Sequence, residues 1–153
     1  MKSIQVGDRV PELSFVAHDG RKISLADFQG KQAVVLFFYP ADNTTVCTRE
    51  ACSFRDAYQE FLQAGAVVIG VSGDSESSHR SFAETQRLPY LLAADVDGAL
   101  RDAFGVPKTF GLLPGRVTYV IDREGVVRHV FHSQLRARKH VEEALRIVRN
   151  LER

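Results

Sequence analysis

The chain has 153 residues and a formal net charge of +1, and 44% of its residues are hydrophobic and 25% charged. This balance is that of a globular protein rather than a disordered chain, and the length predicts a single domain over residues 1–153. A nucleic-acid-binding protein would carry a basic excess, which is missing. The longest apolar run, residues 33–39, is too short to cross a bilayer, and the first residues lack a signal-peptide core. We therefore expect a cytoplasmic protein with neither a membrane nor a nucleic-acid partner.

The first predicted elements are two short strands, at residues 13–17 and 22–24, separated by the turn signal Asp19-Gly20. They predict a β-hairpin at the start of the chain. The run at 33–39 is apolar throughout, which is typical of a strand buried on both faces, and Pro40 ends it.

A helical pattern follows over about residues 45–64, and Gly65 stops it. Residues 66–72 form a second continuous apolar run. Two buried strands joined by a helix predict a right-handed parallel crossover.

The rest of the chain predicts a helix, a strand, a helix, two strands and a final helix, at residues 75–86, 90–93, 98–104, 117–121, 126–131 and 138–151. Between the last two strands, the segment from Asp122 to Gly125 is a strong hairpin signal. The predicted fold class is α/β, with a central mixed β-sheet, helices on both faces and an N-terminal β-hairpin.

Cys47 and Cys52 are the only cysteines in the chain. Two thiols in one short segment of a cytosolic protein point to redox or metal chemistry rather than to a disulfide scaffold. The histidines form no metal signature, since His129 and His132 are three residues apart on a predicted strand and face opposite sides. We therefore expect neither a metal nor another cofactor.

Cys47 falls in the first turn of the predicted helix, just after the carboxyl end of a strand, where open α/β sheets bind ligands. The unpaired backbone N–H groups and the dipole at a helix start favour an anion. A thiolate stabilised in this way is the nucleophile of cysteine chemistry at neutral pH.

Helical geometry separates the two thiols. An apolar stripe that faces the core starts at Cys47 and continues through Ala51, Phe54, Tyr58 and Phe61. Cys52 lies about 140° around the helix from Cys47 and about 7.5 Å along it. The two Cα atoms are then about 8.7 Å apart, beyond the roughly 7 Å limit for a disulfide. A catalytic cycle that joins both thiols must therefore unwind the first turns of the helix.

The spacing of Pro40, Thr44 and Cys47 is similar to the active-site motif of peroxiredoxins, which is a proline, three residues, a threonine, two residues and a cysteine. A second cysteine five residues later resembles the bacterioferritin-comigratory, or Q-type, branch. Likenesses run along nearly the whole chain, at residues 6–11, 25–30, 68–72 and 116–122. One departure is Thr45-Val46, where the family commonly has Pro-Gly.

The resemblance implies a thioredoxin-like fold and a thiol peroxidase in which Cys47 attacks the O–O bond of a hydroperoxide. Thr44 would hydrogen-bond the peroxide oxygens, and Arg116 would stabilise the thiolate and the developing charge. Pro40 would shield the thiolate from water, and Glu50 would orient Arg116.

The resemblance further implies that Cys52 condenses with the oxidised Cys47 to give a disulfide, which thioredoxin or a similar thiol reductant reopens. It also implies a monomer. The alternative function is a redox-sensing or holdase-type interaction protein on the same fold. A general thiol–disulfide oxidoreductase is disfavoured, because the spacing is not Cys-x-x-Cys.

Other interpretations of the same residues stay open. Cys47 could be a buried structural thiol, Cys52 a bystander and Thr44 a helix cap. The basic run Arg136, Arg138, Lys139 and His140 is interrupted by Glu142 and Glu143, which is typical of a solvated helix face. Phe110, Leu112 and Leu113 could line a substrate or partner surface.

Overall fold

The computed structural model describes residues 4–106, 108–109 and 113–151. Its main sheet has five strands in the order β5-β4-β3-β8-β9. These strands are β3 (Ala33–Phe38), β4 (Ala66–Ser72), β5 (Leu91–Ala94), β8 (Val117–Ile121) and β9 (Val127–His132). The β3–β4 and β4–β5 pairs are parallel, and the β3–β8 and β8–β9 pairs are antiparallel. The sheet is therefore mixed, as the sequence predicts.

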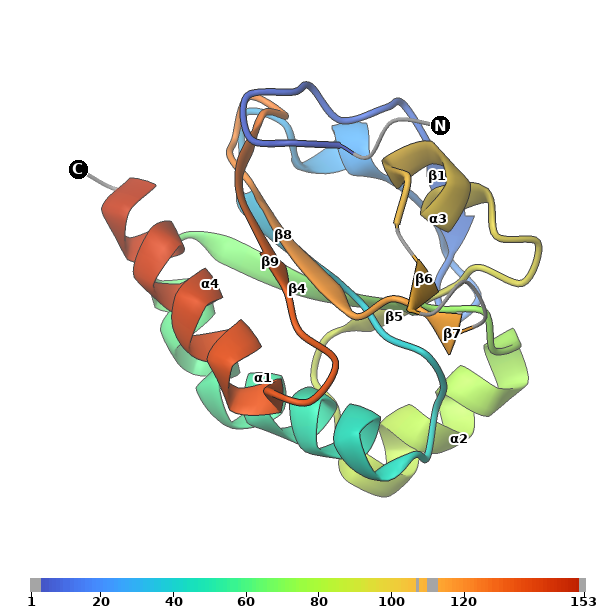
Figure 1. The fold of residues 1–153 in the computed structure, drawn as a ribbon. Helices are drawn as coiled ribbons and strands as arrows, with labels where there is room; N and C mark the ends of the chain where they lie inside the picture. Colours follow the sequence, from blue (N-terminus) through green and yellow to red (C-terminus); the bar gives the residue numbers. More distant parts are fainter. Residues whose placement is uncertain (1–3, 107, 110–112, 152–153) are drawn as a thin grey trace.

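Helices cover both faces of this sheet (Figure 1). They are α1 (Thr45–Gln63), α2 (Glu76–Gln86), α3 (Ala99–Phe104), the 3-10 helix η1 (Leu25–Phe28) and α4 (Ala137–Leu151). Alternate side chains of β3 divide the core into two layers. One layer, which includes Val35 and Phe37, packs against α1, α2 and α4, and the other, which includes Leu36, packs against α3 and η1. Because both faces of β3 are buried, all six of its residues are apolar.

Two smaller sheets are separate from the main sheet. The predicted N-terminal hairpin is present as β1 (Ser14–Val16) and β2 (Lys22–Ser24). A second pair, β6 (Lys108–Thr109) and β7 (Leu113–Pro114), has only two residues in each strand, too few to produce a readable sequence pattern. Phe110 and Leu112 lie outside the described residues, and so does the side chain of Leu113, so the expectation that they line a surface stays a prediction.

Helix α1 begins at Thr45 and ends at Gln63, close to the predicted bounds. Thr44 occupies the N-cap position with an extended backbone, and Gly65 adopts a φ of 84° just after the last turn. Replacement of the family's Pro-Gly by Thr45-Val46 is therefore compatible with a helix that starts two residues before Cys47. None of the described helices combines the length and the apolar character needed to span a membrane.

Candidate active site

Cys47 is the third residue of α1 and is only 1% exposed. The predicted apolar stripe is present: Ala51, Phe54 and Phe61 are fully buried, and Tyr58 packs against the same core as a partly buried residue. The loop between β3 and α1 places Cys47 at the carboxyl end of β3. The expected position of Cys47, in the first turn of the helix and facing inward, is confirmed.

Arg116 directly precedes β8, and the register pairs the next residue, Val117, with Phe38 at the end of β3. The antiparallel pairing therefore brings the start of β8 to the edge of the sheet where Cys47 lies. The guanidinium Nη2 donates a hydrogen bond to Cys47 Sγ at 3.2 Å. Because Arg116 is only 5% exposed, its positive charge acts on the sulfur with little screening by water.

Two further hydrogen bonds fix the guanidinium in this position. Nη1 donates to Glu50 Oε1 at 2.6 Å, and Nε donates to the carbonyl of Gln134 at 2.9 Å. Burial by itself lowers the pKa of Arg116, but the charges of Glu50 and Cys47 outweigh burial and raise it above its usual value. The arginine is thus permanently charged and held by its partners.

Glu50 is fully buried one turn along α1 from Cys47. Burial raises the pKa of its carboxyl to about 7, although the ion pair with Arg116 acts in the opposite direction. Its second oxygen, Oε2, has no hydrogen-bond partner among the described residues and lies 3.5 Å from His140 Nδ1. Glu50 therefore sits between a cation and a histidine ring.

His140, on α4, completes this buried group, and sequence reasoning missed it. Its Nε2 faces the carbonyl of Ser133 at 2.8 Å and must donate there, so Nδ1 accepts from the hydroxyl of Thr118 at 2.7 Å. Burial lowers the pKa of His140 to about 4, and the ring is neutral at pH 7. The expectation that this basic run is a solvated helix face holds for the three exposed residues Arg136, Arg138 and Lys139.

For His140 that expectation is wrong, because the side chain is completely buried. The helical spacing could have indicated this burial, because Ala137, Val141 and Ala144 are also buried and surround His140 on the inner face of α4.

Thr44 and Pro40 lie on the loop between β3 and α1 that leads to Cys47. Thr44 is exposed, and its hydroxyl donates to the carbonyl of Ala41 at 3.0 Å rather than capping the helix through its side chain. The oxygen of Thr44 retains its capacity to accept a hydrogen bond. Pro40 is half-buried directly after Tyr39 at the end of the β3 run.

Cys52 lies on a different side of α1 from Cys47, as the helical geometry predicts. It is half-buried, and its Sγ donates to Gln86 Oε1 at 3.3 Å, at the end of α2. Both cysteines are free thiols on a continuous helix. The structure is therefore that of the reduced protein with the helix intact.

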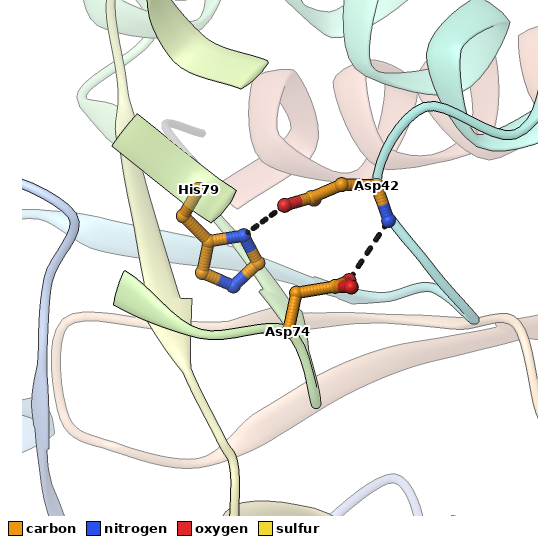
Figure 2. A group of neighbouring side chains, drawn as sticks. All are labelled: Asp42, Asp74 and His79. Carbon is orange, nitrogen blue, oxygen red and sulfur yellow. Dashed lines mark hydrogen bonds and ion pairs between the residues drawn. The ribbon is translucent and has the colours of Figure 1, made fainter. Parts of the chain in front are cut away.

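A hydrogen-bonded cluster anchors the loop that leads into α1, and Figure 2 shows its three central side chains, the buried Asp42 and His79 and the half-buried Asp74. Asp74 Oδ2 accepts from the backbone N–H of Asp42 at 2.8 Å, and Asp42 Oδ2 lies 2.8 Å from His79 Nδ1. His79 Nε2 faces the carbonyl of Ala93 at 3.0 Å. Both ring nitrogens of His79 therefore lie within hydrogen-bond distance of an oxygen.

The geometry would also suit a metal ion, since three potential ligand atoms from Asp42, Asp74 and His79 lie within 4.8 Å of one another. Each of the two carboxylates already accepts hydrogen bonds, Asp42 Oδ2 from Ser78 and from His79, and Asp74 Oδ2 from Ser72. The cluster is thus satisfied internally, and it holds the loop in place.

Comparison with known proteins agrees with this geometry. The AhpC/TSA family model matches residues 6–130. The chloroplastic peroxiredoxin Q of Triticum aestivum is 46% identical over 97% of this chain and 68% of its own length. Two solved structures superpose along nearly the full length of both chains. The peroxidoxin BcpB of Mycobacterium tuberculosis has a TM-score of 0.89 at 35% identity, covering 97% of this chain and 98% of its own.

The second structure is the Xanthomonas campestris bacterioferritin comigratory protein, which was studied for its alkyl peroxide reduction activity. It has a TM-score of 0.86 at 28% identity and covers 95% of this chain and 100% of its own. The fold and the cysteine–arginine contact therefore define a thiol peroxidase built on a thioredoxin-like domain.

The chain belongs to the AhpC/TSA family and, within it, to the bacterioferritin-comigratory or Q-type peroxiredoxins. The resemblance predicted from Pro40, Thr44, Cys47 and Cys52 is confirmed at the level of the family and its peroxidase activity. The alternative of a redox-sensing or holdase-type protein is not favoured.

Proposed function

We propose that Cys47 is the peroxidatic residue and that it reduces both hydrogen peroxide and organic hydroperoxides. The contact from Arg116 Nη2 to Cys47 Sγ carries this proposal, because a buried cation against the sulfur stabilises the negative charge of a thiolate. The thiolate attacks the terminal peroxide oxygen, an S–O bond forms and the O–O bond breaks. The products are the sulfenic acid and, after protonation, water or an alcohol.

The other residues around the sulfur have assisting roles in this proposal. Thr44 accepts a hydrogen bond from the hydroperoxide O–H, since its own proton is donated to Ala41. Nη1 of Arg116 donates to Glu50, so the positive charge of the guanidinium stays in place while negative charge develops on the leaving oxygen. Pro40 shields the sulfur from water on the loop side.

We further propose that Cys52 resolves the sulfenic acid. Its thiol attacks the Cys47 sulfur, the S–S bond forms, the S–O bond breaks and water leaves, taking the thiol proton. An external thiol reductant, thioredoxin or a similar protein, then reduces the disulfide. The expected monomer and cytoplasmic location stay predictions, and the plant relatives are named as chloroplastic.

Stopped-flow oxidation of the reduced protein, followed by mass spectrometry, tests the proposal. Wild type should consume one equivalent of hydrogen peroxide or cumene hydroperoxide rapidly and yield a Cys47–Cys52 disulfide. Cys52→Ser should still react once and leave a trappable sulfenic acid, and Cys47→Ser should be inactive. Peroxide consumption by Cys47→Ser at the wild-type rate would overturn the assignment of the peroxidatic residue.

A further inference from the structure

The thiol of Cys52 is hydrogen-bonded to Gln86, a residue that has no role in the reaction proposed above. Cys52 Sγ donates to the side-chain oxygen of Gln86 at 3.3 Å. Gln86 is the last residue of α2, and its backbone carbonyl accepts from Arg55 Nη1 at 2.8 Å. Two adjacent turns of α1, carrying Cys52 and Arg55, are thus both tied to one residue at the end of α2.

This arrangement opposes the motion that disulfide formation requires. On an intact helix the Cα atoms of Cys47 and Cys52 are about 8.7 Å apart, beyond the roughly 7 Å that a disulfide allows. The helix must therefore unwind before the two sulfurs can meet, and Cys52 cannot keep its hydrogen bond to Gln86 when it attacks, because the donated proton is lost. Breaking the hydrogen bond is part of the reaction and adds to its barrier.

The chemistry of the bond acts in the same direction. The proton that the thiol donates to the amide oxygen must leave before the sulfur attacks, because the attacking species is the thiolate. An amide is too weak a base to remove the proton. The hydrogen bond from Cys52 to Gln86 therefore stabilises the state before the reaction and is lost when Cys52 attacks.

We propose that Gln86 is a positioning residue that holds Cys52 away from Cys47 and thereby sets the rate at which the sulfenic acid becomes a disulfide. This inference rests on the proposed role of Cys52 as the resolving thiol. The step itself is unchanged: the sulfur of Cys52 displaces the hydroxyl from Cys47 as water.

A consequence concerns the fate of the sulfenic acid. It partitions between attack by Cys52 and reaction with a second hydroperoxide, which gives the sulfinic acid. A bond that slows the first route lengthens the life of the sulfenic acid, so Gln86 makes the enzyme more sensitive to excess peroxide.

Two substitutions of opposite effect test the proposal. Gln86→Met retains the length of the side chain and its helix propensity but removes the amide acceptor. It should accelerate disulfide formation about two- to tenfold, the effect of losing one hydrogen bond. Gln86→Glu offers a charged acceptor and should slow the same step. Thr85→Ala, at an exposed neighbouring position on α2, should match wild type.

Stopped-flow kinetics separate the two phases, and mass spectrometry measures the sulfinic fraction at excess hydrogen peroxide. The first phase, oxidation of Cys47, should be equal in all four proteins, while the sulfinic fraction falls in Gln86→Met and rises in Gln86→Glu. Equal second phases, or shifts in the same direction for Met and Glu, would refute the role of Gln86. If wild type forms no Cys47–Cys52 disulfide at all, the resolving role of Cys52 fails as well.

Discussion

Glu50 and His140 give a prediction that depends on the sign of two pKa shifts. Burial raises the pKa of Glu50 from 4.5 to about 7, so between these values the folded protein holds a proton that the unfolded chain has released. The contribution of Glu50 to the free energy of unfolding therefore falls as pH rises through this window.

Burial lowers the pKa of His140 from 6.5 to about 4, so here the unfolded chain holds the additional proton and the contribution rises with pH. Each slope amounts to about 1.4 kcal/mol per pH unit where only one state is protonated. The two windows overlap from pH 4.5 to 6.5, where the slopes have opposite sign. In wild type these two contributions should nearly cancel, while each alone changes the free energy of unfolding by about 3 kcal/mol.

Urea unfolding of the reduced protein between pH 4.5 and 7 measures this. The stability of Glu50→Gln relative to wild type should rise with pH by about 1.4 kcal/mol per pH unit, and that of His140→Gln should fall at a similar rate up to pH 6.5. The double variant should run parallel to wild type between pH 4.5 and 6.5, whatever its absolute stability. If Glu50→Gln stays a constant free energy apart from wild type over the whole range, the reasoning is wrong.

Two other substitutions have expected effects of known direction. Arg116→Lys cannot reproduce the planar contacts to Cys47 and Glu50, so the second-order rate constant of Cys47 oxidation should fall about 100-fold in stopped-flow measurements; an unchanged constant would contradict the role of the guanidinium. Asp42→Asn replaces one of the buried carboxylate oxygens that accept from Tyr39 and Ser78 with an NH2 group, and the free energy of unfolding at pH 7, from urea titration, should fall by about 3 kcal/mol. A stability equal to wild type would contradict the role of this carboxylate in holding the loop.

Local sequence patterns predicted most of the helices and strands of the fold. Continuous apolar runs predict the buried strands at 33–38 and 66–72. The periodicity of the segment between them, and the glycine that follows it, predict the helix. The two-residue strands β6 and β7 were not predicted, because a ladder of that length has no period to detect.

At the site, sequence patterns placed Cys47 and Cys52 on the helix, and the family resemblance predicted the other site residues, Pro40, Thr44, Glu50 and Arg116. The burial of His140 and the cluster around Asp42 and His79 were missed. Each of these contacts joins side chains that are 22 to 37 positions apart in the chain, such as Thr118 with His140 and Asp42 with His79. No local spacing encodes such a contact.

The sequence by itself determined the types of the longer elements through their hydrophobic patterns. It also determined that Cys47 lies in the first turn of a helix and how far around that helix Cys52 lies, because both follow from the start and the period of one helix. Only the tertiary structure decided what surrounds each sulfur. The antiparallel pairing of β8 with β3 brings Arg116 to Cys47, and the packing of α2 beside α1 brings Gln86 to Cys52. The charge and reactivity of each sulfur depend on those neighbours and on burial, and both arise only when the chain has folded.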